Sequence, residues 1–550
     1  MTANNQYPGL YQHFQWLVPA RFHLADACCE RWAAQGLSAR HIALYLEDAD
    51  GRREVWTFER LHHDAMRLAH ALLRMGLQPG DRVAILLPPQ GEFLVSLLAA
   101  WHVGAIAVPL STQLDATLLE RCLRDSGSRV AITQSSTYAR LLPGLHRCTS
   151  LQQIIGINLH NDRAVPWRGL LARQPAHAAP RQYAAEALLL YDTQPGTPPR
   201  GLLHGHAALL GALSGFVAAH NWFPQHASSY WVGLDWALPA ALLGGVLPCL
   251  YFGQALAAQK ATLPVVAQPG FLARHGVSHL LTTPLVLHQL RRALQQQPQA
   301  LPHLHTIVST GQALGPALAS WYAQHLGLAI NNAYSPTGMP LLAGQSHSRW
   351  ADPPDSLGRP YPGHRLQPLN PDGTPAPPGQ VGDLVVWQHD TRNEPDPAWW
   401  YGQWPDRAGA TQPWRSSGDL ATLDADGRLW WCGRQAHLIH TEHGPLNPEQ
   451  LEAVLLEHPA VAEVGIVALS EAPDPLKLKA WVVALPGRLA ADVADDILAL
   501  GRRGWPAAAR DAAWVLDFTE ALPRQPSGRL QRAALRARDR SRRRRSRKAA

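Results

Sequence analysis

The sequence predicts an α/β protein: a large N-terminal domain of βαβ sheets with a β-rich subdomain, followed by a small α+β C-terminal domain. Three observations predict this class. Apolar runs typical of strands alternate with helical patterns between residues 42 and 157. A segment rich in Pro and Gly at about 353–380 precedes a separate strand, and a new helix–strand pattern begins at Leu451. A chain of 550 residues is also too long for one hydrophobic core.

The first part of the chain has the pattern of a hairpin followed by buried strands and helices. Two strand-like runs within 42–58 flank the turn Asp50-Gly51. Leucine and alanine then recur at helical spacing until Gly76, which ends the predicted helix. The apolar run 82–87 is typical of a strand buried on both faces. Further strands are predicted at 105–108, 130–132 and 151–157.

The second part of the chain predicts the smaller units. Pro371-Asp372-Gly373 is a turn signal, and the strand 384–387 follows it. The helix–strand pattern that starts at Leu451 indicates a compact domain of its own. We therefore predict an N-terminal domain over 1–433, a small C-terminal domain over 434–535, and a tail over 536–550.

Charge is distributed unevenly along the chain. The net charge is +7, but residues 536–548 carry eight Arg and one Lys against Asp539, or +8, which leaves the rest near −1. The positive net charge therefore gives no indication that the chain outside residues 536–548 binds a specific nucleic acid. A block of like charges is expected to be disordered. Two roles stay open for this tail: contact with an anionic surface such as nucleic acid or membrane, or simple solubilisation.

Cysteine usage and hydropathy predict a cytoplasmic protein. None of the six cysteines forms a CxxC pair, so neither a metal site nor a disulfide framework is indicated. The N-terminus lacks a signal-peptide pattern. The stretch between Asp235 and Lys260 has no charge and is long enough to span a bilayer. Its two prolines and Gly244-Gly245 interrupt a helix, so we expect a buried core segment and no transmembrane segment.

Six short segments carry candidate chemistry. The glycines and hydroxyls of residues 191–201 are suited to binding a phosphate group, because they bring backbone N–H groups and further hydrogen-bond donors close to an anion. The six segments are Tyr191–Gly201, Ser309–Leu314, Asn332–Gly338, Trp414–Leu420, Trp431–Ile439 and Leu522–Arg532.

In this order the segments resemble the motifs of the AMP-forming acyl-CoA synthetases, within the adenylate-forming ligase superfamily. The opening stretch from Tyr11 to Phe22 is similar to the acetyl- and medium-chain branch, and the resemblance extends from about Tyr7 to Leu535. It implies an acid–CoA ligase: ATP and a small-molecule carboxylate give an acyl-adenylate and pyrophosphate, and CoA then displaces AMP. ATP/AMP and CoA are the ligands that it implies.

The resemblance assigns nucleotide-binding roles to individual residues. Asp419 and Arg434 match the family residues that hold the ribose, and a carboxylate suits two hydroxyls because it accepts two hydrogen bonds. Gln312 lies in the adenine segment, Tyr334 is the conserved aromatic position of its motif, and Thr337 matches the contact to the α-phosphate. An aspartate after a glycine is also common as a turn or cap residue, and that role stays open for Asp419.

Several reacting positions differ from the family pattern. Arg529 stands where a lysine bridges the substrate carboxylate and the α-phosphate. In the phosphate loop Thr197 keeps a hydroxyl, and Arg200 replaces a lysine with a larger planar group. Gly338 replaces the glutamate that holds Mg²⁺ and offers no side-chain oxygen, so a Mg²⁺ site is in doubt.

Two functions follow from these substitutions. The first is an acid–CoA ligase with impaired adenylation, since each lost transition-state stabiliser typically costs on the order of 10²–10³ in rate. The second is a pseudoenzyme that binds adenine nucleotide or acyl-adenylate in a regulatory or scaffold role. Pyrophosphate exchange into ATP with a panel of carboxylates distinguishes the two.

Overall fold

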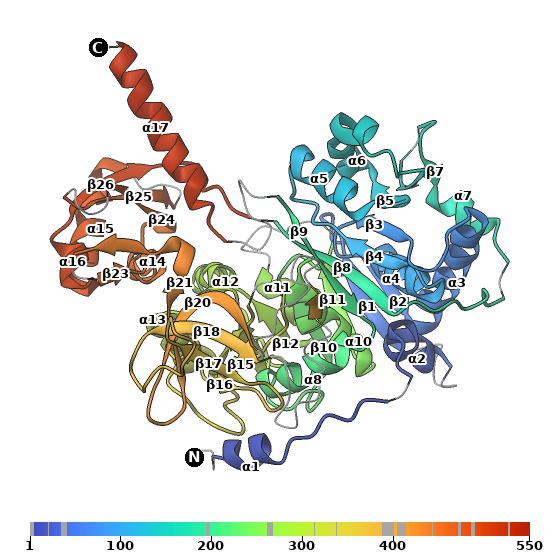
Figure 1. The fold of residues 1–550 in the computed structure, drawn as a ribbon, viewed down its shortest axis with the longest axis horizontal. Coiled ribbons are helices and arrows are strands. Elements are labelled where there is room, and N and C mark those ends of the chain that lie inside the picture. Colours follow the sequence, from blue (N-terminus) through green and yellow to red (C-terminus); the bar gives the residue numbers. More distant parts are fainter. Residues whose placement is uncertain are drawn as a thin grey trace.

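The computed structural model confirms the predicted α/β class with two large mixed sheets, a four-stranded sheet and a three-stranded sheet in a small C-terminal domain (Figure 1). The structure describes residues 5–19, 21–34, 41–159, 161–175, 177–193, 198–260, 268–312, 314–336, 338–387, 401–403, 414–442, 444–470, 475–485, 490–525 and 529–549. Helix α17 leaves the small domain and ends far from the rest of the chain (Figure 1).

The first large sheet has nine strands in the order β16-β15-β14-β13-β12-β10-β11-β1-β2. The central pairs, from β14 across to β1, are parallel, and both edges are antiparallel. Its strands are β1 (Ile42–Glu47), β2 (Arg53–Thr57), β10 (Ser229–Val232), β11 (Ala255–Gln259), β12 (Val277–Thr282), β13 (Thr306–Ser309), β14 (Ile330–Tyr334), β15 (Ala343–Gly344) and β16 (Arg359–Pro360). The hairpin predicted within 42–58 is confirmed as β1 and β2.

The second large sheet has eight strands in the order β19-β9-β8-β4-β3-β5-β6-β7. Its strands are β3 (Arg82–Leu86), β4 (Ile106–Pro109), β5 (Val130–Gln134), β6 (Gln153–Ile157), β7 (Val165–Pro166), β8 (Glu186–Asp192), β9 (Arg200–Gly205) and β19 (Tyr401–Gln403). The predicted strands at 82–87, 105–108, 130–132 and 151–157 are confirmed as β3 to β6. β8 and β9 form an antiparallel pair on either side of the glycine-rich segment, whose residues 194–197 lie outside the described part of the chain.

Helices cover both sheets, and their ends follow local chemistry. Helix α3 (Phe58–Arg74) begins where the Thr57 hydroxyl accepts a hydrogen bond from the Arg60 N–H, at 3.1 Å. It ends just before Gly76, whose φ of 79° favours glycine. The other helices of this domain are α1 (Tyr7–Gln12), α2 (Arg31–Ala33), α4 (Gly91–His102), α5 (Ala116–Ser126), α6 (Ser135–Leu141), α7 (Trp167–Ala172), α8 (Ala208–Ala219), α11 (Gln268–Arg274), α12 (Pro284–Gln296) and α13 (Pro316–Leu326).

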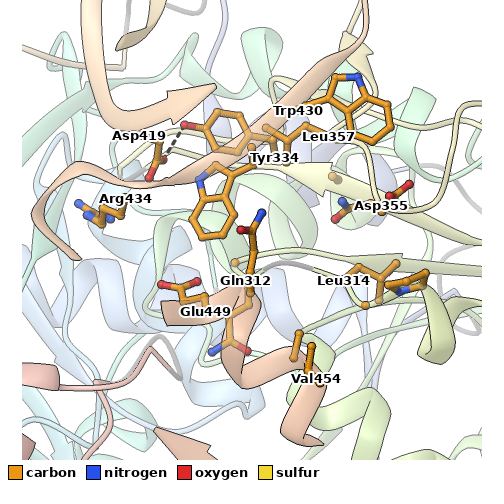
Figure 2. Close-up of a pocket in the computed structure, with 18 of the residues that line it drawn as sticks. Gln312, Leu314, Tyr334, Asp355, Leu357, Asp419, Trp430, Arg434, Glu449 and Val454 are labelled. Carbon is orange, nitrogen blue, oxygen red and sulfur yellow. Dashed lines mark hydrogen bonds between the residues drawn. The ribbon is translucent and has the colours of Figure 1, made fainter. Parts of the chain in front are cut away.

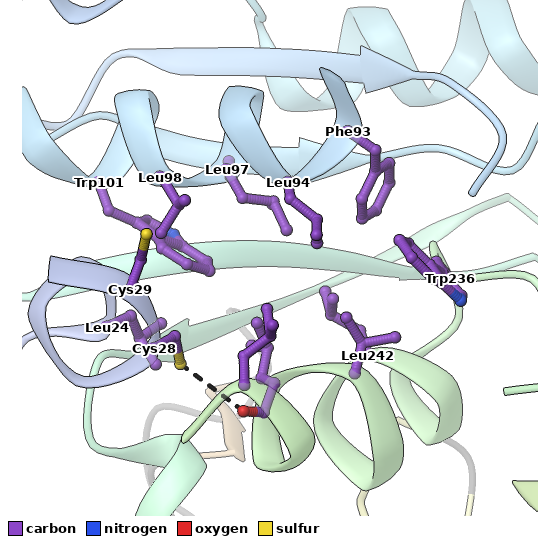
Figure 3. Packing of buried hydrophobic residues seen from close by; sticks show 14 of the residues in the cluster. Leu24, Cys28, Cys29, Phe93, Leu94, Leu97, Leu98, Trp101, Trp236 and Leu242 are labelled. Atoms are coloured by element: carbon purple, nitrogen blue, oxygen red, sulfur yellow. Dashed lines mark hydrogen bonds between the residues drawn. The ribbon is translucent and has the colours of Figure 1, made fainter. Parts of the chain in front are cut away.

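The main core lies where α4 packs against the helical segment that follows β10. Figure 3 shows Phe93, Leu94 and Trp101 of α4 facing this segment, with Trp236 and Leu242 on the opposite side. Because α4 is apolar on every face, it is buried along its whole length. The same core cluster also includes residues from strands of both large sheets, such as Leu44 of β1 and Val83 of β3.

The uncharged stretch between Asp235 and Lys260 is part of that core, as the sequence predicts. It forms α9 (Pro239–Ala241), a π-helical turn (Leu242–Val246), α10 (Leu247–Tyr251) and strand β11. Leu242 and Val246 are fully buried. Across the described residues, none of the helices has both the length and the apolar character of a membrane span.

The β-rich subdomain is an antiparallel sheet in the order β17-β18-β20-β21. Its strands are β17 (Leu366–Leu369), β18 (Gly382–Trp387), β20 (Trp414–Leu423) and β21 (Leu429–Arg434). The predicted turn at Pro371-Asp372-Gly373 is confirmed: the Asp372 carboxylate accepts the Thr374 N–H at 2.9 Å, and Gly373 has a φ of 84°.

The small domain has a hydrophobic core of its own that runs from Ile439 to Phe518. The boundary predicted after Gly433 falls one residue before the end of β21. The elements of the small domain are η7 (Gln435–His437), β22 (Ile439–Thr441), β23 (Gly444–Leu446), α14 (Pro448–Leu456), β24 (Val461–Ser470), β25 (Lys477–Ala484), α15 (Ala490–Gly504), α16 (Ala507–Arg510), β26 (Ala513–Phe518) and α17 (Arg532–Ala549).

The tail differs from the expectation of disorder. Residues 536–549 continue α17 as a helix instead of forming an unstructured terminus. Arginine and alanine are both good helix formers, and like-charge repulsion alone does not outweigh their preference. The start of the helix is also anchored, because Leu535 is fully buried and the Asp539 carboxylate pairs with the Lys479 ammonium at 2.7 Å.

Candidate functional site

A cavity of about 460 Å³ lies between the large domain and the small domain. Figure 2 shows residues of β14, β20 and β21 on one side and residues of α14 on the other. It brings together five of the predicted residues: Gln312, Tyr334, Asp419, Arg434 and Arg529. These residues are up to 217 positions apart in the sequence, so the fold rather than the local chain creates the site.

Asp419 is the anchor of the cavity. The residue is 4% exposed, and its carboxylate accepts a hydrogen bond from the Tyr334 hydroxyl at 2.7 Å (Figure 2). Burial first, and the charge of Asp419 second, raise the pKa of Tyr334 well above its usual value. Tyr334 therefore stays protonated and donates to one carboxylate oxygen. The second oxygen of the Asp419 carboxylate can accept a hydrogen bond from a ligand hydroxyl.

Arg434 lies beside Asp419 because of strand register. The two residues are directly opposite each other on the antiparallel strands β20 and β21. Opposed residues on such a pair project from the same face of a sheet. The pairing thus places a cation and a carboxylate together at the rim of the cavity, where both can contact one polyhydroxylated group.

One side of the cavity is apolar and was not predicted from the sequence. Leu314 and Leu357 are buried there, and Trp430 and Trp431 on β21 are partly exposed toward it. Gln312 adds an amide to the same region (Figure 2). Flat apolar walls with one hydrogen-bonding amide suit a planar heterocycle. The adjacent tryptophans Trp430 and Trp431, shortly before Arg434, are the sequence signal that could have indicated this apolar side of the cavity.

Arg529 lies between this cavity and a second, smaller one. The second cavity has a volume of about 90 Å³ and includes Leu234 and Leu238 among its apolar lining residues. Gly311, Ser335 and Arg529 line both cavities. A guanidinium at this junction can contact anionic groups on either side, so two ligands bound in the two cavities would meet at Arg529.

The described residues on either side of Arg529 contact the small domain. The Gln525 N–H donates to the Arg529 carbonyl at 2.8 Å, and the Arg524 guanidinium pairs with Glu463 on β24 at 2.8 Å. Just beyond the loop, Arg532 is buried and forms an ion pair with Glu452 of α14. These contacts fix both ends of the loop to the same domain.

Glu449 and His437 are further cavity residues that sequence reasoning missed. The His437 ring lies 3.4 Å from the Glu449 carboxylate. Burial alone would raise the pKa of Glu449, but the hydrogen bond from His437 and the charges of Arg532, His437 and Arg529 hold it below its usual value. The small domain therefore presents a carboxylate as well as Arg529 to the cavity.

Gly338 lies in the wall of the smaller cavity, and its backbone excludes most side chains. Its φ is 78°, a left-handed conformation that favours glycine. A Cβ added there would overlap the Cδ1 atom of Leu202. The glutamate expected from the family motif thus has no place in this conformation. Among the described residues, no group of three or more His, Cys, Asp and Glu side chains is arranged to hold a metal ion.

The structure does not assign the other three predicted site residues to either cavity. Arg200 is exposed at the start of β9 and is not among the described residues that line either cavity. Thr197 and Thr337 lie outside the described residues. The phosphate-binding roles implied for these three residues rest on the sequence resemblance alone.

Comparison with solved structures places the fold in a class, that of the adenylate-forming ligases. The chain matches the anthranilate CoA ligase AuaEII, solved in complex with anthranoyl-AMP, with a TM-score of 0.81 and 21% identity over 94% of this chain and 98% of that one. The model of the AMP-binding enzyme family matches residues 29–391, which is more than half of the chain. The chain therefore belongs to the AMP-binding enzyme family.

Its relatives by sequence are acyl-CoA and acetyl-CoA ligases. It is 25% identical to the uncharacterized acyl–CoA ligase YtcI of Bacillus subtilis, over 95% of this chain and 97% of that protein. It is 26% identical to the mitochondrial acyl-coenzyme A synthetase ACSM2 of Rattus norvegicus, over 95% of this chain and 92% of that protein. The resemblance found in the motifs thus extends over nearly the whole chain.

Proposed function

We propose that this protein is an AMP-forming acid–CoA ligase whose adenylation step is slow. The reaction joins ATP and a small carboxylic acid into an acyl-adenylate with release of pyrophosphate, and CoA then displaces AMP. The observation that carries the proposal is the position of Arg529 in the lining of two adjacent cavities, one with polar anchors and a flat apolar wall, the other small and lined by both apolar and hydroxyl side chains. The names of the relatives support the same reaction.

The larger cavity holds the nucleotide in this proposal. Asp419 and Arg434 bind the ribose hydroxyls, and Tyr334 fixes the rotamer of Asp419. Gln312 binds the edge of the adenine, whose faces pack against the apolar wall. The smaller cavity takes the acyl group of the acid. Thr337, Thr197 and Arg200 remain proposed phosphate contacts from the sequence resemblance.

Arg529 provides positive charge where the acid carboxylate attacks the α-phosphate. Neutralising two anions that approach each other is the main electrostatic task of this step. A guanidinium is wide and planar, whereas the lysine of the family motif ends in a compact ammonium. We therefore expect Arg529 to hold both anions but to leave them farther apart, which slows the attack.

Magnesium does not fit the position from which the family motif would bind it. Gly338 has no side-chain oxygen, and its left-handed backbone next to Leu202 does not accommodate a glutamate. No step of the proposed reaction is therefore assigned to a metal held by this residue. The buried or partly buried state of all six cysteines, each unpaired, supports a reduced cytoplasmic compartment.

A second candidate is a pseudoenzyme that binds adenine nucleotide or acyl-adenylate without making thioesters. The geometry at Gly338 favours it, because the residue that would hold the metal is absent while Asp419 and Arg434 remain in place. In that case the cavity serves a regulatory or scaffold role.

Pyrophosphate exchange into ATP, measured with a panel of carboxylates and CoA-free buffer, tests both candidates. We expect slow exchange by the wild type and faster exchange by Arg529→Lys, with no change in Arg540→Lys, a matched control on the exposed part of α17. Nucleotide binding without exchange in either Arg529 form would support the pseudoenzyme. Absence of nucleotide binding in a folded protein would contradict both candidates.

A further inference from the structure

Helix α17 is a second feature with chemistry of its own, separate from the cavities. Its base is fixed to the small domain: Leu535 packs with Val467 and Trp481, and Arg532 is buried against Glu452. Beyond the base the helix runs outward, and its C-terminal end lies away from every other element in Figure 1. The backbone of α17 therefore continues beyond its anchored base as one helix, which we call the rod.

The charge of this rod is almost entirely positive. Residues 536–548 contain eight Arg, one Lys and a single acid, Asp539. Asp539 is buried and pairs with Lys479, which also pairs with Asp517 at 2.6 Å. The only carboxylate of the segment thus faces the small domain. Arg538 and Arg540 are exposed, and among the described residues neither forms an ion pair with a carboxylate.

The cations also recur at helical spacing. Positions 536, 540, 543, 544 and 547 follow the i, i+4, i+7, i+8, i+11 pattern that defines one face of a helix. Over this interval a helix rises by about 16 Å at 1.5 Å per residue. One face of α17 thus carries five arginine positions along a length comparable with half a turn of B-form DNA, about 17 Å.

From this array we propose that α17 binds double-stranded DNA without sequence preference, with the helix in the major groove and its arginines on the phosphates of both strands. The groove is about 12 Å wide and admits an α-helix. Guanidinium groups bind phosphate oxygens in a bidentate manner and remain charged at any physiological pH. The proposal is independent of the ligase function.

A membrane surface is a weaker match to the same helix. Helices that lie in a bilayer interface bury a face of Trp, Phe or Leu among the lipids. After the buried Leu535, the only apolar residues of α17 are Ala537 and Ala549. The rest of the chain has a net charge near −1, so it adds no attraction of its own to any polyanion. Binding is therefore confined to the helix.

The test measures fluorescence anisotropy of a labelled 20-base-pair duplex with the full chain. For five phosphate contacts we expect the Kd to weaken about 500-fold between 50 and 200 mM salt. Removal of residues 541–550 should abolish binding, and it spares Leu535 and the Lys479–Asp539 pair, so the melting temperature should stay unchanged. An unchanged affinity after this truncation would overturn the proposal.

A charge-matched variant tests the helix itself. Ser541→Pro with Ser546→Pro keeps every cation but interrupts the helix. We expect its affinity for the duplex to fall by about tenfold or more, because fewer arginines reach the phosphates together. Equal affinity of this variant and the wild type would overturn the role of the helix. Tighter binding of the wild type to single strands, to an RNA duplex or to vesicles with anionic lipid than to DNA would overturn the choice of partner.

Discussion

Replacing Asp419 with alanine is the sharpest test of the nucleotide site. The carboxylate is buried, and one of its oxygens is already occupied by the Tyr334 hydroxyl at 2.7 Å. The other oxygen is available to the ribose. Alanine therefore removes the ligand contact and also leaves the Tyr334 hydroxyl without this acceptor.

The size of the effect follows from the charge of the acceptor. A hydrogen bond to a charged group contributes about 1.5–3 kcal/mol, which corresponds to about 10- to 150-fold in the Kd for AMP. Loss of the acceptor for a buried hydroxyl also costs about 1–3 kcal/mol of folding stability. Asp419→Ala should therefore bind AMP more weakly and unfold at lower urea concentration than the wild type.

Titration calorimetry with AMP measures the first effect, and urea unfolding measures the second. Tyr334→Phe keeps the carboxylate, so we expect it to lose stability but to retain most of its affinity. Asp426→Ala changes an exposed aspartate in the turn between β20 and β21 and serves as the control. If folded Asp419→Ala bound AMP as tightly as the wild type, the assignment of this carboxylate to the ribose would be refuted.

Three further outcomes are expected. Burial lowers the pKa of five histidines to about 3: His204, His206, His220, His288 and His364. These side chains stay neutral in the folded protein but take up a proton when the chain unfolds below pH 6.5. The unfolded state therefore binds more protons than the fold, so the contribution of these histidines to the free energy of unfolding is fully present above pH 6.5 and is lost as the pH decreases. At pH 5 the loss is roughly 2 kcal/mol per histidine. Urea unfolding at pH values between 7 and 5 should show it. Lys479→Met should cost about 3–5 kcal/mol because it removes the ammonium that pairs with the buried Asp539, whereas Lys477→Met, at the exposed start of the same strand, should change little. Equal effects of the two would contradict a structural role for the Lys479–Asp539 pair. We also propose that the chain divides into domains near Gly433, so limited trypsin digestion should cut at residues 433–440 and yield two stable fragments, and a single resistant core would argue against the division.

Much of the large domain could be predicted because its elements carry local signals. The buried strand β3 is a continuous apolar run, and α3 ends at a glycine with positive φ. The antiparallel pair β8–β9 was not predicted, since strand pairing depends on partners rather than on either strand alone. For α17, charge density predicted disorder, but two contacts to the small domain anchor the helix at residues that the composition does not distinguish.

The site was predictable only where motifs name single residues. Asp419, Arg434, Tyr334, Gln312 and Arg529 were identified from such motifs, and they line one cavity. Its apolar wall and its second carboxylate come from elements with ordinary patterns, and only packing of the two domains makes them part of the site. The motif expectation at Gly338 could not include the left-handed backbone or the nearby Leu202 of β9, neither of which is visible in the sequence.

The anchoring of the loop around Arg529 constrains how the protein can move. Arg524 and Arg532, on either side of Arg529, are attached to β24 and α14, so the backbone at Arg529 is coupled to the small domain. We therefore expect Arg529 to move together with the small domain in any rotation of that domain. We expect such a rotation to be centred on the short connection that follows β21. We expect a ligand that favours one orientation of the small domain also to determine whether a positive charge lies at the junction of the cavities.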